Sequence, residues 1–230
     1  MQGSDVYSVL KGIGAMDLHH ANSVTTSSTF LKQGGLLSRG FIEDHKLPQT
    51  QQSSDEIDKK YGLWHCVFVD HVDIHSRGGR KKGPNQYGPV LFVLDLDVLL
   101  RLPEGSKVLV TKMNPIYWRE KQPDSERWFM SKEELAANIA FGDFGKMLVI
   151  QTPSEKLVFP NRRVRIILDD PQRQISSGKN AYTYAEDRLN SAAVAGRVAA
   201  SIERRECDYG CICVEKYATY SAKTIDLYFT

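Results

Sequence analysis

The sequence lacks any long hydrophobic run and any recognisable export signal. No apolar stretch approaches the roughly 20 residues that a membrane-spanning helix needs, so we expect no membrane partner. The N-terminal segment "MQGSDVYSVLKGIGAMDLHH" has no basic stretch followed by a long apolar one, so we expect no secretory signal. Both absences favour a cytoplasmic protein.

A large excess of charge of one sign is also missing. The 230 residues include 30 Lys plus Arg and 28 Asp plus Glu, which leaves a net charge of +2. Overall charge therefore does not indicate nucleic acid as a partner, and any such contact must come from local clusters. The hydrophobic content of 41% suits a single globular domain over residues 1–230.

Cysteine is sparse, with Cys66, Cys207, Cys211 and Cys213 as its four positions. Without an export signal, reduced thiols are favoured over a disulfide framework. The cluster "CDYGCIC" does not have CxxC spacing and no histidine follows it, which argues against zinc. We therefore expect no metal, and we expect thiols buried beside a terminal strand instead.

Strand-like runs dominate the middle of the chain, and helical patterns stand at both flanks. Apolar and β-branched runs predict strands at 16–22, 63–75, 87–96, 106–115, 146–160 and 162–170. Helical patterns cover 26–35, 131–141 and 182–206. Thr29 or a neighbouring Ser/Thr can cap the first of these helices, and Ser131 caps the second. Residues 211–217 and 224–229 resemble closing strands. The pattern predicts an α+β fold with a mainly antiparallel sheet.

Three short stretches stand out when they are taken in order. They are "LHHANSVTTSSTFLKQGGLLSRG" at 18–40, "NQYGPVLFVLD" at 85–95 and "SEKLVFPN" at 154–161. Together they resemble the ADP-ribosyltransferase superfamily, and most closely its DarT-like branch. The resemblance covers about residues 15–170 and implies a split, mainly antiparallel sheet with flanking helices, followed by a C-terminal part at about 172–230.

The resemblance extends to individual positions. His20 and Asn22 stand where the family's first strand carries a His-x-Thr element, with Asn22 replacing the usual Thr or Ser. Arg39 ends a Gly-Leu-Leu-x-Arg segment, and Tyr87 opens a Tyr-x-Pro segment. Glu155 begins "EKLVFP", which is similar to the family's catalytic Glu-x-Leu-Val-x-Pro strand.

These matches imply NAD as substrate and a role for each residue. Transfer of ADP-ribose breaks the bond between nicotinamide and ribose, and a carboxylate such as Glu155 can stabilise the positive charge that builds on the sugar. The implied cofactor-binding residues are His20, Asn22, Arg39, Tyr87 and Phe92, with Arg39 on the pyrophosphate. No Gly-x-Gly-x-x-Gly motif follows a strand, so a Rossmann site is not expected.

Ordinary structural roles remain open for the same residues. Glu155 could be a surface glutamate in a turn, and Arg39 a solvated arginine. His19 and His20 face opposite sides of a strand, so one of them can belong to the core. A second set of acids and histidines is "VDHVDIH", with Asp70, His71, Asp73 and His75. It could hold a divalent metal, face a substrate, or only form hydrogen bonds.

Local basic clusters indicate single-stranded RNA or DNA as acceptor. The loop "SRGGRKKGPNQ" carries Arg77, Arg80, Lys81 and Lys82, and "PNRRVR" carries Arg162 and Arg163. Aromatic residues at Tyr117, Trp118 and Trp128 could stack on open bases beside these cations. A solvated charged loop is the alternative.

The family resemblance also bears on biology. DarT-like enzymes are toxins that modify single-stranded DNA, and the sequence looks similar to a phage-defence member that modifies messenger RNA. That resemblance implies a neutralising antitoxin protein. Two alternatives stay open: an enzyme that modifies protein, for which Pro153 disfavours an arginine acceptor, and a non-catalytic nucleic-acid-binding module.

Overall fold

A computed structural model describes residues 1–76, 83–207 and 209–230. It contains three sheets, of which the largest has the strand order β1 (Asp17–Asn22), β4 (Val90–Asp95), β8 (Arg163–Leu168) and β9 (Ala199–Arg204). A second sheet has the order β3 (Val67–Val69), β6 (Leu148–Gln151) and β5 (Lys107–Val110), and β2 (Gly35–Leu37) pairs with β7 (Lys156–Val158). Only β8 and β9 run parallel among these pairs, which confirms a mainly antiparallel α+β protein.

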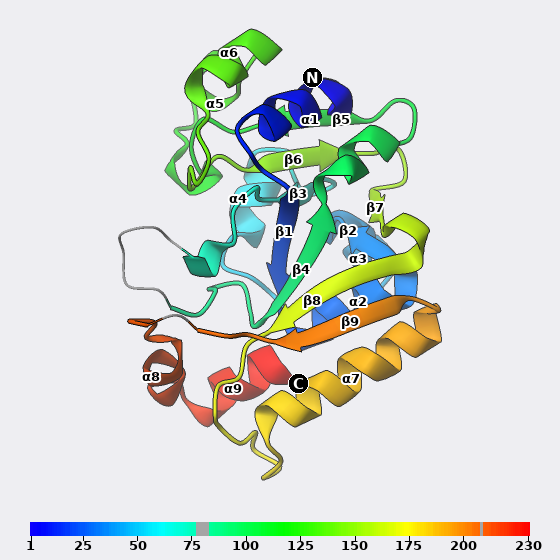
Figure 1. Cartoon of the computed structure of the whole chain (residues 1–230), viewed down its shortest axis with the longest axis vertical. Helices are drawn as coiled ribbons and strands as arrows, with labels where there is room; N and C mark the ends of the chain where they lie inside the picture. The colour runs from blue at the N-terminus through cyan, green and yellow to red at the C-terminus, as the bar shows by residue number, and fades with distance from the viewer. Residues whose placement is uncertain (77–82, 208) are drawn as a thin grey trace.

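The two larger sheets meet at His19 and Asp70. The backbone amide of His19 donates to the Asp70 carbonyl at 2.7 Å, and the amide of Asp70 donates back at 2.9 Å. β1 therefore pairs with β4 along its length and touches the end of β3 at one point. Figure 1 shows β5 and β6 crossing above the β1–β4 pair. No helix of the described residues is long and apolar enough to cross a membrane.

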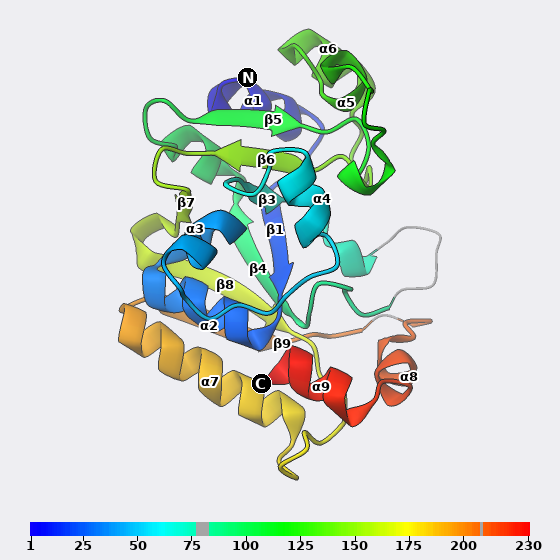
Figure 2. The ribbon, with the colours of Figure 1, turned by 180° about the vertical axis from the view of Figure 1, so that it is seen from behind.

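Helices surround the sheets on several sides. They are α1 (Gly3–Gly12), α2 (Val24–Gln33), α3 (Arg39–Asp44), α4 (Asp55–Lys60), α5 (Asp124–Arg127), α6 (Lys132–Asn138), α7 (Ala181–Gly196), α8 (Cys213–Ala218) and α9 (Ala222–Phe229). Short 3-10 turns are η1 (Ile74–Ser76), η2 (Leu96–Arg101), η3 (Pro115–Tyr117) and η4 (Pro160–Arg162). Both views of the ribbon place α2 and α7 side by side, with α3 and α4 on the face turned toward the viewer in Figure 2.

The main core lies between α2 and the four-stranded sheet. Phe30 of α2 packs edge-on against Phe92 of β4 at 5.8 Å between ring centroids, and Phe92 stacks on Phe159 at 5.6 Å. All three rings are at most 1% exposed. Phe92 was expected to bind the cofactor, and the structure places it instead inside this core, where Phe30 covers it.

Capping residues set the ends of α2, though one of them differs from the prediction. The helix begins after Ser23, whose Oγ accepts a hydrogen bond from the Thr26 amide at 3.4 Å, and it ends at Gly34 in the left-handed region with φ 72°. The expected cap was Thr29 or a neighbouring Ser/Thr; Ser23 takes that role, and Thr29 lies inside the helix and donates to the Pro48 carbonyl at 2.7 Å. The helix starts early because Ser23 directly follows β1. Ser131 caps α6 as expected.

The C-terminal part differs most from the sequence prediction. The helix predicted over 182–206 ends at Gly196, and residues 199–204 form β9. Gly196 lies so close to α2 that a Cβ there would stand 2.0 Å from the Leu31 carbonyl oxygen, and Arg197 then turns left-handed with φ 53°. The two predicted closing strands are also wrong, because they form α8 and α9. Ile225 and Phe229, four residues apart, are both fully buried, which is a helical spacing.

Candidate functional site

A cavity of about 580 Å³ opens where β1, β3 and the β5–β6 connection come together. Four of the five predicted cofactor residues line it: His20, Asn22, Arg39 and Tyr87. They come from the end of β1, the start of α3 and the loop before β4. Gly88 allows that loop to approach β1 closely, because a Cβ at this position would stand 2.4 Å from the Asn22 carbonyl. The structure thus gathers three separate motifs around one space.

His20 is held in one tautomer. Its Nδ1 lies 2.7 Å from the Phe68 carbonyl oxygen, which can only accept, so Nδ1 carries the proton. Its Nε2 is then an acceptor, and the Asn22 side-chain amide donates to it at 3.4 Å. Burial lowers the pKa of His20 to about 4, so the ring is neutral at neutral pH. The ring also packs against Phe30 at 5.4 Å.

The guanidinium of Arg39, which was predicted to bind the pyrophosphate, already forms several hydrogen bonds within the protein. It forms a buried two-point ion pair with Asp55, from Nε at 3.0 Å and from one terminal nitrogen at 2.7 Å. The same terminal nitrogen donates to the Thr50 carbonyl at 2.9 Å. The other terminal nitrogen is buried without a hydrogen-bond partner among the described residues. Asp55 therefore takes the two-point contact that a pyrophosphate would need, and the one guanidinium nitrogen without a partner among the described residues is itself buried.

Glu155 is not among the residues that line the cavity, and the two side chains that its carboxylate contacts belong to chain neighbours of residues that do. Its Oε2 accepts from Ser38 Oγ at 2.7 Å and contacts His65 Nδ1 at 2.9 Å. Ser38 stands beside Arg39 in the chain, and His65 stands beside Cys66, which lines the cavity. Burial and then the nearby charge of Glu155 raise the pKa of Cys66 to about 11. The Glu155 side chain is 29% exposed, so it does not point freely into solvent.

The backbone at Glu155 is unusual for a glutamate. Its φ of 52° lies in the left-handed region, which costs a residue with a Cβ about 1–2 kcal/mol. The residue follows a turn in which the Glu155 amide donates to the Thr152 carbonyl at 3.0 Å, and the Glu155 carbonyl accepts from the Ser38 amide at 2.9 Å. Such positions concentrate at functional sites, where the surrounding structure holds them.

Two carboxyl groups in the cavity were not singled out as site residues in advance. Asp58 of α4 and Asp70 after β3 both line it. Burial, with the charge of Asp55 as a second cause, raises the pKa of Asp58 to about 7. Burial alone raises the pKa of Asp70 to about 7. Strongly shifted carboxyl groups in a cleft are typical of functional sites. The sequence indicates Asp70 only as one member of the set of acids and histidines in "VDHVDIH".

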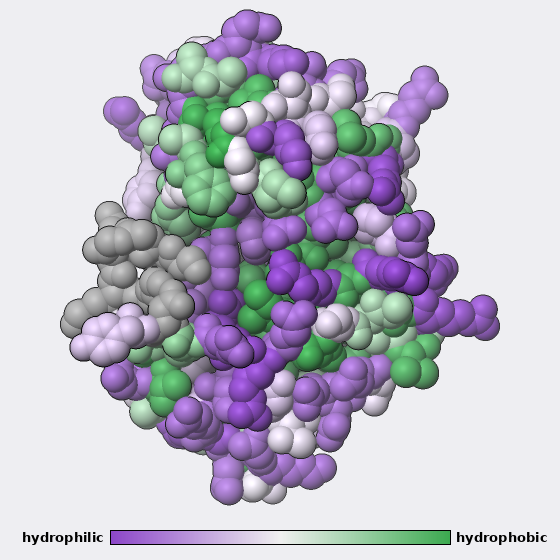
Figure 3. Space-filling model, viewed as in Figure 1, coloured by the Kyte–Doolittle hydropathy of each residue, from purple (hydrophilic) through white to green (hydrophobic). Residues whose placement is uncertain are grey.

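The predicted aromatic surface divides into an exposed and a buried part. Tyr117 is 72% exposed at the cavity and stands near Ile116 and Phe144, which also line it. Trp118 and Trp128 are buried and pack edge-on against each other at 4.7 Å, so the structure contradicts their expected role in stacking on bases. Figure 3 shows hydrophobic side chains gathered at the upper left, over the β5–β6 connection.

The predicted basic residues do not gather at the cavity. Arg162 donates to the Gly196 carbonyl at the end of α7, at 2.8 Å, and Arg163 is exposed at the start of β8. Neither residue lines the cavity. Arg77, Arg80, Lys81 and Lys82 lie outside the described residues. The described cations that do line the cavity besides Arg39 are Lys112 and Lys146.

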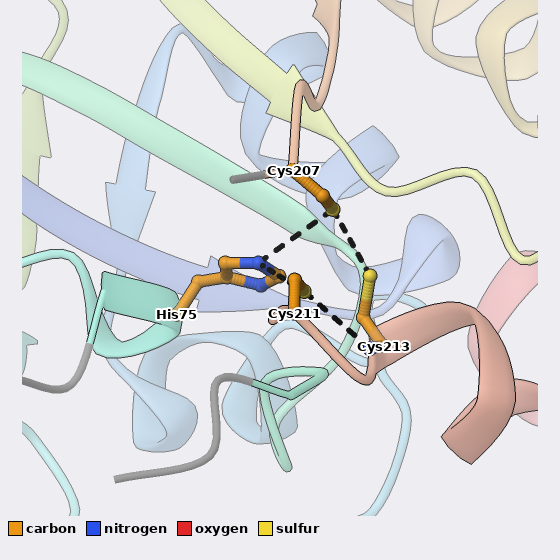
Figure 4. A group of neighbouring side chains, drawn as sticks. All are labelled: His75, Cys207, Cys211 and Cys213. Atoms are coloured by element: carbon orange, nitrogen blue, oxygen red, sulfur yellow. Dashed lines mark hydrogen bonds between the residues drawn. The ribbon is translucent and has the colours of Figure 1, made fainter. Parts of the chain in front are cut away.

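The second set of acids and histidines separates into different environments. Asp70 faces the cavity, while Asp73 forms an ion pair with Arg205 at 2.8 Å. His75 joins a group that we call the Cys3His cluster, which consists of His75, Cys207, Cys211 and Cys213. The side chains of this cluster point toward one another, and their ligating atoms all lie within 4.8 Å (Figure 4). All four cysteines of the chain are free thiols.

Comparison with known proteins adds no relative: no protein-family model matches the chain, and no curated protein matches it. The geometry of the cavity and the motifs that surround it are therefore the features that bear on function.

Proposed function

We propose that the chain is an NAD-dependent ADP-ribosyltransferase, with an ADP-ribosyltransferase-like split sheet, that acts on a base of single-stranded nucleic acid. The acceptor that the family resemblance favours is messenger RNA in anti-phage defence, with an antitoxin protein as partner. The observation that carries the proposal is the common cavity of His20, Asn22, Arg39 and Tyr87. Its volume of about 580 Å³ lies in the range of small-molecule sites.

Hydrogen bonding gives the polar residues complementary roles toward a dinucleotide. The fixed tautomer of His20 makes Nε2 an acceptor, and a ribose hydroxyl would donate to it in place of the long 3.4 Å contact from Asn22. The remaining nitrogen of Arg39 supplies a charge-assisted donor for the pyrophosphate. The ring of Tyr87 offers a flat surface for nicotinamide or adenine.

Glu155 supplies the charge that the reaction needs. The bond between ribose C1′ and the nicotinamide nitrogen breaks, nicotinamide leaves as a neutral base, and positive charge builds on the ribose. A carboxylate fixed by Ser38 and His65 stabilises that charge without having to reorganise. As the acceptor atom bonds to C1′, it gives up its proton to Glu155 or to solvent.

The opening of the cavity supports a nucleic-acid acceptor. Exposed Tyr117 stands among lining residues that include Lys112 and Lys146, and rings beside cations suit unpaired bases. The predicted phosphate-binding loop follows Ser76 directly in sequence, and Ile74 of the same turn lines the cavity.

The test is transfer of label from NAD that is labelled in its adenylate part. Purified full-length protein is incubated separately with single-stranded RNA, single-stranded DNA and a protein extract. We expect label in a nucleic-acid pool and release of nicotinamide in equal amount. Label only in protein would favour an enzyme that modifies protein. Binding to oligonucleotides without label in any pool would favour the non-catalytic module.

A further inference from the structure

The Cys3His cluster joins two segments that are far apart in the chain. His75 belongs to η1, while the three cysteines lie between β9 and the first residue of α8. His75 and Cys207 are 132 positions apart in sequence, yet Nε2 and Sγ are 3.8 Å apart. Figure 4 shows the imidazole and the three thiols converging on a common point.

The distances within the cluster lie close to the edges of a tetrahedral site. Zn–S bonds of about 2.3 Å and Zn–N bonds of about 2.0 Å give S–S edges near 3.8 Å and S–N edges near 3.5 Å. Sγ of Cys207 lies 3.1 Å from Sγ of Cys213, and Sγ of Cys211 lies 3.3 Å from Nε2 of His75. An ion would need to separate the two sulfur atoms by about 0.7 Å and the sulfur and nitrogen atoms by about 0.2 Å.

Contacts around the cluster hold its two halves together. Asp73 accepts a hydrogen bond from the His75 backbone amide at 2.9 Å, and it forms an ion pair with Arg205 at 2.8 Å. Arg205 stands two residues before Cys207 and also forms an ion pair with Asp169. On the other side, the Cys213 amide donates to Cys211 Sγ at 3.4 Å, which suits a thiolate. The ligand positions are therefore set by neighbouring contacts as well as by each other.

Packing alone does not account for the arrangement of the thiols. Cys207 is exposed and Cys211 is partly exposed, whereas a thiol that serves only as a small hydrophobic side chain is usually buried among apolar groups. Neutral thiols are also weak hydrogen-bond donors, so three of them gain little by facing one another. Three thiolates and one imidazole form a complete ligand set for a structural zinc ion, and soft sulfur ligands disfavour magnesium and calcium.

We propose that the Cys3His cluster binds one Zn²⁺ ion, which fastens the C-terminal segment to the wall of the cavity. The four protein ligands complete the coordination, so the ion is structural and does not take part in the transfer reaction. Ile74, beside His75, lines the cavity, and Tyr228 of α9 donates to the Gln86 carbonyl at 3.0 Å, next to Tyr87. By holding the C-terminal segment in place, the ion stabilises these contacts beside the cavity.

Metal content of the full-length protein, purified with reductant and without chelator, tests this proposal independently of any transfer assay. We expect about one zinc ion per chain by native mass spectrometry and elemental analysis. His75→Ala and Cys211→Ser each remove one of the four ligands, so both variants should be purified with well under one zinc ion per chain. The matched controls Cys66→Ala and His45→Ala change the same residue types outside the cluster and should keep it.

Cobalt substitution covers the case in which the ligand variants do not fold. After zinc is removed from the wild-type chain, Co²⁺ should give the intense visible bands of a tetrahedral thiolate site, and added Zn²⁺ should abolish them. Chelation should lower Tm by several degrees, because ligand binding to the folded state contributes to its stability. The proposal is overturned if the protein shows neither stoichiometric zinc nor cobalt bands, or if His75→Ala and Cys211→Ser both retain zinc. Stoichiometric iron, or a disulfide between Cys207 and Cys213, would overturn it as well.

Discussion

Ser38 donates a hydrogen bond to the Glu155 carboxylate at 2.7 Å across 117 positions of sequence. Ser38 also caps α3, because its Oγ accepts from the Phe41 amide at 2.9 Å. The start of α3, which carries Arg39 into the cavity, is thereby linked directly to the turn that carries Glu155. β2 and β7 pair immediately beside this contact, which keeps the two motifs in register.

Replacement of Glu155 by Gln removes the negative charge with little change in shape. We expect transfer to fall by about 10²-fold or more, because one preorganised electrostatic group at a reacting centre contributes that much. The melting temperature and NAD affinity should stay close to those of the wild type. The control is Glu43→Gln, which removes an exposed carboxylate that pairs with Lys59 at 3.2 Å. Undiminished turnover in Glu155→Gln would remove the proposed mechanism.

His20→Phe separates the packing role of the ring from its hydrogen bonding. Phenylalanine keeps an aromatic ring against Phe30 but lacks the Nε2 acceptor. We expect NAD affinity to fall by about tenfold, the effect of losing roughly one hydrogen bond. Stability should fall by about 1–3 kcal/mol, because the Phe68 carbonyl loses its donor. Calorimetric titration with NAD measures the first effect and urea unfolding the second. The exposed His45→Phe serves as control, and equal NAD affinity in both variants would contradict the assigned role.

Asp70 makes stability depend on pH in a defined direction. Burial raises its pKa from 3.8 in the unfolded chain to about 7 in the folded protein. Between these values the folded state holds a proton that the unfolded state has lost, so this contribution to stability is complete below pH 3.8 and disappears as the pH rises through 7. Asp70→Asn mimics the protonated form. It should therefore gain stability relative to the wild type as the pH rises from about 4 to 7.

Urea unfolding at pH 5 and pH 8 measures this difference. The control Asp226→Asn should give no gain at pH 8, because hydrogen bonds from Ser176 lower the pKa of Asp226 and favour its charged form in the folded state. A stability difference between wild type and Asp70→Asn that is the same at both pH values would show that Asp70 is ionised in the folded protein at both.

The parts of the fold with clear periodicity were predictable from the sequence. The strand at 16–22, the helix after it, the strand that begins at Val90 and the turn at Glu155 all have a signal in their own local sequence. The strand β9 was not predictable, because its sequence "AASIER" is rich in helix-forming residues. It becomes a strand only by pairing with β8. Such tertiary pairing leaves no signal in the segment itself.

The candidate site, too, was predictable where local motifs mark it and not where distant segments meet. The motifs pointed to His20, Asn22, Arg39 and Tyr87, but not to Asp55, which occupies most of the Arg39 guanidinium. The spacing of the cysteines did not indicate the Cys3His cluster, because its histidine comes from η1, far from the cysteines in sequence. The available signal was the pair of fragments "DIH" and "CDYGCIC", which only the fold brings together.

Tyr117→Ala tests whether the cavity opening binds unpaired bases. Stacking on an aromatic side chain contributes about 1–3 kcal/mol per base, so affinity for a single-stranded oligonucleotide should fall by roughly fivefold or more. NAD affinity should change less, because Tyr117 is 72% exposed and few of its atoms are buried in the cavity. Phe141→Ala is the matched control, since Phe141 is 68% exposed on the same β5–β6 connection but does not line the cavity. Fluorescence anisotropy with labelled RNA and DNA measures both variants. An equal loss of oligonucleotide affinity in both variants would mean that the whole β5–β6 connection contacts the nucleic acid non-specifically. No loss of affinity in Tyr117→Ala would place the acceptor elsewhere on the protein.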